Sequence, residues 1–107
     1  MSDICVLGNF VADNSFYAKQ LPTKGQTVFG TGYQVGPGGK GSNQAIAAAR
    51  LGSKVNFLGK IGNDANGKMA IDLYKKNNID QKTIYISKEY PTGVAGIMIN
   101  KEDGTNA

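Results

Sequence analysis

The sequence predicts an α/β fold with a largely parallel sheet, and three observations support this class. Short apolar runs typical of buried strands alternate with helix-forming segments along the chain. This order of strand, helix, strand, helix and strand favours parallel neighbours joined by crossover helices. The composition, with 40% hydrophobic and 19% charged residues, is that of an ordinary globular protein. At 107 residues the chain forms at most one domain.

The first strand is predicted over residues 3–8, which contain a continuous apolar run and end at Gly8. Such runs are typical of parallel strands that are buried on both faces. We therefore expect Cys5, the only cysteine, to be a buried and unreactive thiol. A single cysteine also rules out an internal disulfide.

Residues 14–35 interrupt the α/β pattern with β-prone fragments separated by glycine and proline. We expect two extended strands here, joined by a turn near residues 22–25 (Pro-Thr-Lys-Gly). Residues 36–39 (Gly-Pro-Gly-Gly) are expected to break the chain before the next element. The strand pair is therefore predicted to be an insertion.

The first helix is predicted over residues 42–51, where four alanines provide high helix propensity. Gly52 follows it and can adopt the left-handed backbone that ends many helices. A second apolar strand is expected over residues 55–58. Asp64 or Asn66 is placed to cap a second helix, which extends to about position 77.

The last part of the chain contains two further strand candidates, over residues 83–86 and 94–99. Asp103-Gly104 follows the second candidate and predicts a hairpin turn with a return strand. Only residues 105–107 remain for that strand, so we expect the chain to be a truncated form of a longer protein.

Composition and charge exclude several classes of function. The chain has no histidine, which excludes His-based catalytic triads and most zinc sites. The net charge is +4, but the eleven lysines and Arg50 are scattered, so no nucleic-acid surface is expected. No apolar run approaches the roughly 20 residues that span a bilayer, and no signal peptide opens the chain. A cytoplasmic protein without nucleic-acid or membrane partners is therefore expected.

The glycine-rich segment 36–44 formally matches parts of two nucleotide-binding motifs, and neither motif fits. A P-loop requires Ser or Thr after its lysine, whereas Gly41 follows Lys40. The dinucleotide pattern G-x-G-x-x-G occurs at residues 36–41, but the preceding segment is a poor central strand. Lys60 also stands where that pattern needs an acidic residue for the ribose.

The same segment can instead surround a polar ligand. Consecutive glycines let the backbone approach a ligand closely, and a helix start presents N–H groups without helical partners. Lys40 adds a donor, and Asn43 offers both a donor and an acceptor. This combination suits a polyhydroxylated ligand such as a sugar. The alternative, a glycine-rich turn that only starts a closely packed helix, stays open on these grounds.

Paired glycines, small residues and an Asn occur at set distances in residues 38–45 (Gly-Gly-Lys-Gly-Ser-Asn-Gln-Ala), followed by Gly52 and Gly62. Every position over these 25 residues resembles the N-terminal signature of the ribokinase-like (PfkB) carbohydrate kinases, and ribokinases proper most of all. Other motifs follow in family order, so the resemblance covers essentially the whole chain: Gly8 with Asp13, and residues 22–27, 62–67 and 92–95.

The resemblance implies a ribokinase-like doubly wound fold with a small β lid, of which residues 1–107 are only the N-terminal part. It implies ATP-dependent phosphorylation of a sugar hydroxyl, the terminal one of ribose or a related pentose. It also implies that a carboxylate, backbone groups and polar side chains of this chain bind the sugar. These residues are Asp13, Gly38, Gly39, Lys40 and Asn43.

By the same resemblance, the lid comprises two segments, about 14–36 and 93–107, which close over the sugar and can form a homodimer interface. The family's catalytic base belongs to a Gly-Ala-Gly-Asp helix start, which has no match here. The base and the sites for ATP and Mg²⁺ are therefore expected beyond Ala107. No catalytic residue is assigned to this chain, which is expected to be inactive alone.

Val11 departs from the ribokinase pattern, which has Asn two residues before the motif Asp. Losing that polar partner favours a sugar without the matching hydroxyl, because an unpaired buried hydroxyl costs about 1–3 kcal/mol. A deoxy sugar, or another hydroxyl pattern, is therefore expected over ribose. Two other function classes stay open: a non-catalytic sugar-binding or dimerising module, and a nicotinamide-dependent enzyme.

Overall fold

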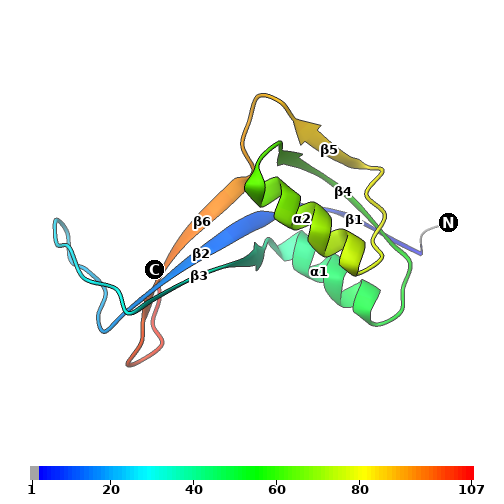
Figure 1. The fold of residues 1–107 in the computed structure, drawn as a ribbon. Helices are drawn as coiled ribbons and strands as arrows, with labels where there is room; N and C mark the ends of the chain where they lie inside the picture. The colour runs from blue at the N-terminus through cyan, green and yellow to red at the C-terminus, as the bar shows by residue number, and fades with distance from the viewer. Residues whose placement is uncertain (1–2) are drawn as a thin grey trace. The chain divides into compact units, whose positions relative to one another are not determined.

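The computed structural model describes residues 3–107, and Figure 1 shows the order of the helices and strands. The chain divides into two compact units. The α/β unit contains the described residues up to Ala12 together with Pro37–Gly93. The β unit contains Asp13–Gly36 and Val94–Ala107. Each unit is described below by itself.

A parallel sheet of three strands forms the frame of the α/β unit. The strands are β1 (Ile4–Leu7), β4 (Val55–Gly62) and β5 (Ile84–Ser87), in the order β1-β4-β5. Both pairings are parallel, with Val6 opposite Phe57 and Ile61 opposite Ile86. The predicted parallel sheet is confirmed. Strand β4 is longer than the predicted residues 55–58.

Two helices, α1 (Lys40–Arg50) and α2 (Ala65–Lys76), cover one face of this sheet (Figure 1). Helix α1 begins two residues before its predicted start, and α2 is capped by Asp64 as one of the two predicted alternatives. The core lies between the helices and the sheet. It consists of Phe10, Ala12, Ala45, Ile46, Val55, Phe57, Ile61, Ala70, Tyr74 and Ile79.

Tyr74 lies at the centre of this core and has no solvent exposure. Its ring centroid is 4.9 Å from that of Phe57 and 6.3 Å from that of Phe10, which it meets edge-on. Its hydroxyl donates a hydrogen bond of 2.8 Å to the buried Ser42 Oγ. Burial raises the pKa of the Tyr74 hydroxyl, and the bond to Ser42 partly offsets that rise. Tyr74 therefore ties α2 to α1 in its neutral form.

The prediction that the first strand and Cys5 are buried is wrong. Cys5 is exposed, and Leu7 on the same side of β1 is 78% exposed. Side chains alternate across a strand, so Val6 packs on the core while its neighbours point to the opposite face. In the part of the chain that the structure describes, both helices cover the Val6 face, and β1 is an edge strand.

A second sheet has the strand order β3-β2-β6, and most residues of its strands belong to the β unit. Its strands are β2 (Val11–Ala18), β3 (Gly32–Gly38) and β6 (Gly93–Asn100). The predicted turn near residues 22–25 is present, because the Gln26 amide donates to the Thr23 carbonyl at 2.9 Å. Two extended strands flanking this turn are thus confirmed, although residues 27–30 form an irregular connection.

The expected chain break at residues 36–39 is wrong in part, since β3 continues through Pro37 to Gly38. Proline has no N–H for a strand ladder, but β3 is at the edge of its sheet, where this omission is tolerated.

The predicted hairpin after β6 is confirmed. Gly104 has a left-handed backbone (φ 76°), and its amide donates to the Asn100 carbonyl at 2.9 Å. Met98 and Ala107 exchange two backbone hydrogen bonds of 2.8 and 2.9 Å. Residues 105–107 therefore pair with the end of β6.

Candidate functional site

The glycine-rich segment leads from β3 into α1 within the α/β unit. Gly38 is the buried last residue of β3, and Gly39 is the N-cap of α1 with φ 94°. The Asn43 amide donates to the Gly39 carbonyl at 2.9 Å. No side chain caps α1, and no acidic residue lies in its first turn. An electronegative ligand group can therefore accept hydrogen bonds from this helix start.

The glycines of this segment are also required by packing. A Cβ atom on Gly39 would overlap the Asn9 carbonyl oxygen and lie 3.2 Å from Phe10 Cα. A Cβ on Gly41 would lie 2.9 Å from Gly8 Cα. The segment thus lies directly against the chain that leaves β1. Allowing close packing at the helix start, the alternative role considered for this segment, is therefore part of what its glycines do. This packing leaves the start of α1 accessible.

Lys40 and Asn43 share one exposed side of α1. They are three residues apart, which places their side chains next to each other on a helix. Both are exposed, whereas Ser42, Ala45 and Ile46 face the core. The structure therefore brings Gly38, Gly39, Lys40 and Asn43 together at one helix start.

Val11 and Asp13 lie on the same face of β2, since they are two residues apart. Ala12, between them, faces the core and has no solvent exposure. Asp13 is half-buried and lies inside the strand, with no side-chain hydrogen bond among residues 3–107. An Asx turn at this position, the structural alternative for Asp13, is therefore not formed.

The α/β unit contains Val11 and the helix start, and Asp13 is the first residue of the β unit. The approach of Asp13 to Asn43 across a shared pocket stays a prediction.

Sequence reasoning missed a hydrogen-bond cluster that joins Asp64 to Thr92, 28 residues later. Asp64 Oδ1 accepts from the Gly67 amide (2.8 Å) and the Thr92 hydroxyl (2.7 Å), and Oδ2 accepts from the Thr92 amide (2.8 Å). Thr92 Oγ1 in turn accepts from the Gly62 amide at 2.9 Å. Hydrogen bonds lower the pKa of the Asp64 carboxyl. The bonds from Thr92 have the largest effect, followed by the bond from the Gly67 amide. The sequence signalled only the cap, because no local pattern links distant positions.

Two features are absent from the described residues. No group of three or more His, Cys, Asp or Glu side chains within residues 3–107 is arranged to hold a metal ion. Neither described helix is long and apolar enough to cross a bilayer. The groups present at the helix start, namely backbone N–H, ammonium and side-chain amide groups, can form hydrogen bonds.

Comparison with known proteins gives a consistent family. A family model described as pfkB family carbohydrate kinase matches residues 1–107. The chain is 37% identical over 105 residues to a ribokinase of Bacillus subtilis (strain 168), which covers 98% of this chain and 36% of the relative. It is 40% identical over 100 residues to a deoxyribokinase of Salmonella typhimurium, covering 92% of this chain and 32% of the relative.

The fold is that of the same group. The structure of Arabidopsis thaliana ribokinase complexed with ribose and ATP superposes with a TM-score of 0.86 at 31% identity. The match covers 99% of this chain and 34% of the ribokinase. The predicted ribokinase-like α/β fold is confirmed, and the chain spans about a third of the length of the curated relatives it matches.

Proposed function

Because the chain belongs to the pfkB family of carbohydrate kinases, we propose that the full-length protein transfers the γ-phosphoryl group of ATP to a sugar hydroxyl. The acceptor is the terminal hydroxyl of ribose or a related pentose. The observation that carries this proposal is the start of α1, where Gly38, Gly39, Lys40 and Asn43 converge without a side-chain cap. The ribose- and ATP-bound relative supports the same pair of substrates.

Each sugar-binding residue has a role that follows from its chemistry. The Asp13 carboxylate accepts hydrogen bonds from ring hydroxyls, and backbone groups of Gly38 and Gly39 contact the sugar edge. Lys40 donates, while the Asn43 amide both donates and accepts, so together they fit the alternating polarity of a polyol. Binding fixes the attacking hydroxyl, and such positioning is a large part of phosphoryl-transfer catalysis.

The described residues do not fit ATP and Mg²⁺. Segment 36–44 lacks the P-loop pattern, and residues 3–107 contain no acidic cluster for a metal. We therefore assign the nucleotide, Mg²⁺ and the catalytic base to sequence beyond Ala107, and we derive no step through them. Residues 1–107 alone are expected to be inactive.

The β unit is proposed to be the lid. Closing it over the sugar would exclude water, so that the phosphoryl group reaches the sugar instead of being hydrolysed. Several large apolar side chains of this unit are exposed and can bury surface in a homodimer: Phe16, Phe29, Tyr33, Val35, Val94 and Met98. The same surface favours the alternative role of a sugar-binding or dimerising module without catalysis.

The experiment that tests the kinase proposal is ADP production by the full-length protein with ATP and a panel of pentoses and hexoses. Asp13→Asn and Asn43→Ala should each lower kcat/KM by about tenfold or more, because each removes a hydrogen bond to a sugar hydroxyl. Asp72→Asn, an exposed carboxylate paired with Lys68 on α2, is the matched control and should leave the rate unchanged. A folded full-length protein that phosphorylates no sugar would refute the proposal.

We propose further that Val11 shifts the preference toward a deoxy pentose. Val11 offers no hydrogen bond to a hydroxyl, and the deoxyribokinase relative is among the matches at 40% identity. The full-length protein should therefore have a higher kcat/KM for 2-deoxyribose than for ribose. Val11→Asn should move the ratio toward ribose by about tenfold. A wild-type preference for ribose over all other pentoses would contradict this assignment.

A further inference from the structure

The chain passes between the two units at three places. On the α/β-unit side, each of the three connecting segments lies near residues 9–11. β2 starts at Val11 there. The end of β3 leads to Gly39, which lies against the Asn9 carbonyl and Phe10. β6 starts at Gly93, where a Cβ atom would lie 3.5 Å from the Phe10 carbonyl oxygen and 3.7 Å from Val11 Cγ2. We call Val11, Gly38 and Gly93 the lid roots.

Two of the lid roots are fixed by regular structure. Val11 follows Phe10, which is buried and packs edge-on against the Tyr74 ring. Gly38 is separated from α1 only by the N-cap residue Gly39. Gly93 differs, because it is reached through an irregular loop after β5 whose residue Tyr90 is exposed. β6 itself pairs with β2 in the sheet, but the loop before Gly93 needs another contact to fix it to the α/β unit.

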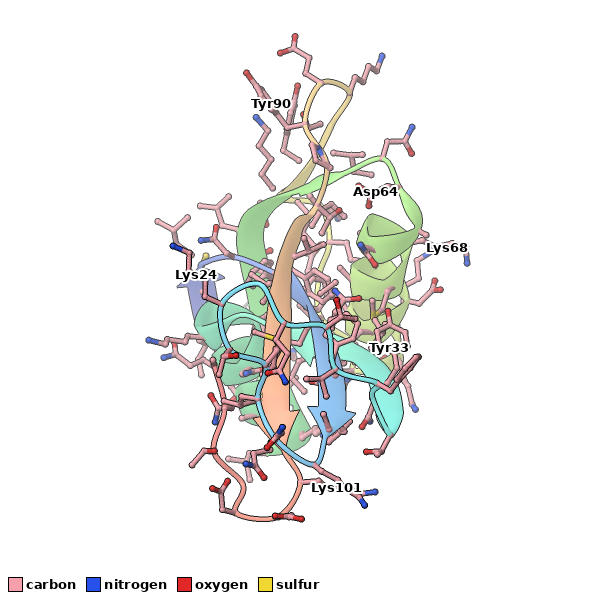
Figure 2. The ribbon with its side chains drawn as sticks, turned by 90° about the vertical axis from the view of Figure 1, so that its left-hand side faces the viewer. Lys24, Tyr33, Asp64, Lys68, Tyr90 and Lys101 are labelled. Carbon is pink, nitrogen blue, oxygen red and sulfur yellow. The ribbon has the colours of Figure 1, made fainter. Side chains whose placement is uncertain are left out.

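The Asp64–Thr92 cluster is that contact. Thr92 directly precedes Gly93 and is only 4% exposed, and both its amide and its hydroxyl donate to the Asp64 carboxylate. The hydroxyl also accepts from Gly62 at the end of β4. Figure 2 shows Asp64 at the start of α2, near the loop that carries Tyr90. The last residue of that loop is thereby bound to the end of β4 and the start of α2.

Two observations show that Asp64 is more than a helix cap. The bond from the Gly67 amide caps α2, whereas two further bonds to the Asp64 carboxylate come from Thr92. Helix α1 of the same unit has no side-chain cap at all, so a helix start here does not require one. The surrounding glycines are also matched to the carboxylate. A Cβ on Gly62 would lie 2.7 Å from Asp64 Oδ2, and one on Gly67 would lie 3.1 Å from Thr92 Oγ1.

We propose that Asp64 and Thr92 are positioning residues that hold the root of β6, so that the β unit can close over the sugar. This inference rests on the proposed kinase function. Neither residue touches the reacting atoms. Loosening the β6 root should weaken sugar binding and let water attack the γ-phosphorus in place of the sugar hydroxyl, which yields ADP and inorganic phosphate.

The test compares Thr92→Val, Thr92→Ser and Asp64→Ser in the full-length protein, with Asp72→Asn as the control on the same helix. Thr92→Val keeps the amide but removes the hydroxyl, and Thr92→Ser restores it. Asp64→Ser keeps one acceptor for the helix cap but loses the second carboxylate oxygen that binds the Thr92 amide. The readouts are the sugar KM, kcat, and the ratio of ADP formed to sugar phosphate formed.

We expect Thr92→Val and Asp64→Ser to raise the sugar KM about tenfold, because each loses a charge-assisted hydrogen bond. They should also raise the ADP to sugar-phosphate ratio above one. Thr92→Ser and Asp72→Asn should behave as the wild type. If Thr92→Val and Asp64→Ser only lower the melting temperature, and leave the sugar KM and the ratio of ADP to sugar phosphate unchanged, the two residues have only a structural role and the proposal fails.

A second measurement is independent of activity. Amide hydrogen exchange at residues 93–95 should be about tenfold faster in folded Thr92→Val than in the wild type, with residues 55–61 of β4 unchanged. Equal exchange rates at these amides in Thr92→Val and wild type would refute the proposal that Asp64 and Thr92 hold β6, regardless of the kinetic results. A wild-type protein that phosphorylates no sugar would instead refute the kinase proposal, while this exchange result would still decide whether Asp64 and Thr92 hold β6.

Discussion

The two units of this molecule are stabilised in different ways. Every residue of the buried hydrophobic core belongs to the α/β unit, whereas the large apolar side chains of the β unit are half-buried or exposed. Phe57 in β4 has no exposure, and Phe16 in β2 is 47% exposed. The α/β unit thus has its own hydrophobic stabilisation, and the β unit depends mainly on hydrogen bonds between strands and side chains.

This difference suggests a division of labour. A small sheet with few fully buried side chains is marginally stable in water by itself and gains from contact with a ligand or a partner. Low stability of this kind fits the lid role proposed for the β unit. The α/β unit supplies the rigid helix start at which the sugar is proposed to bind.

The largest expected effect comes from emptying the core of the α/β unit. Phe57→Ala should lower the free energy of unfolding by about 3–5 kcal/mol, because it leaves a cavity beside Tyr74. Phe16→Ala, the matched change in the β unit, should cost about 1 kcal/mol or less, since Phe16 is half in solvent. Urea denaturation of both variants measures the contrast. Similar losses of unfolding free energy in the two variants would contradict the conclusion that the two units are stabilised in different ways.

Next in size is the addition of a methyl group at Gly39. Gly39→Ala should cost about 2–4 kcal/mol, because it combines a left-handed backbone with overlap on the Asn9 carbonyl. Gly36→Ala, three residues earlier and within β3, is the control, because no atom outside its chain neighbours lies within 4 Å of the added carbon. It should leave the melting temperature nearly unchanged. A tolerated Gly39→Ala would show that this segment is less closely packed than the structure indicates.

A smaller effect separates buried from exposed tyrosine hydroxyls. Tyr74→Phe should cost about 1–2 kcal/mol of unfolding free energy, since it leaves the buried Ser42 hydroxyl without its donor. Adding Ser42→Ala should recover part of that loss in a double-mutant cycle. Tyr33→Phe removes a 2.8 Å bond to Asn14 Oδ1 at the surface of the β unit and should cost about 0.5 kcal/mol or less. Equal losses of unfolding free energy at both tyrosines would contradict the view that only the Tyr74 hydroxyl stabilises a buried core.

The smallest effect is a dependence of stability on pH. Hydrogen bonds from Thr92 hold the pKa of Asp64 below its ordinary value of 3.8, so the folded state binds its proton less readily than the unfolded state. The resulting stabilisation is present above pH 3.8 and is lost as the pH falls through the lower folded value. Asp64→Asn should therefore flatten the acid limb of a plot of unfolding free energy against pH.

Asp103 provides the comparison in the β unit. Its pKa is lowered by Thr105, only two residues away, so its bonds stabilise a local turn. Asp103→Asn should change the acid limb less than Asp64→Asn, whose bonds join segments 28 residues apart. An equal or larger change at Asp103 would show that the long-range bonds at Asp64 add nothing to global stability.

Local chemistry made much of the fold predictable. The cap at Asp64, the alanine-rich α1 and the turn at Asp103-Gly104 each depend on residues within a few positions of one another. These elements were predicted within about two residues. The helix-start part of the candidate site, Gly38 to Asn43, also came from one continuous segment.

Features that depend on distant residues were not predictable. The second strand was predicted to end at residue 58, before Gly59, where a Cβ atom would lie 2.8 Å from the Gly8 carbonyl oxygen. Strand β4 instead continues past Gly59 to Gly62. Cys5 is exposed because its face of β1 is not covered by either helix. The pairing of Asp64 with Thr92 has no counterpart in local sequence at all.

The proline in β3 has a consequence for association between molecules. An outer strand with free backbone N–H groups is a template on which another chain can extend the sheet. Pro37 removes one donor from the outer strand of the β3-β2-β6 sheet, so a neighbouring chain finds an incomplete ladder there. The residue that interrupts the strand pattern in the sequence thereby also discourages aggregation along this side of the molecule.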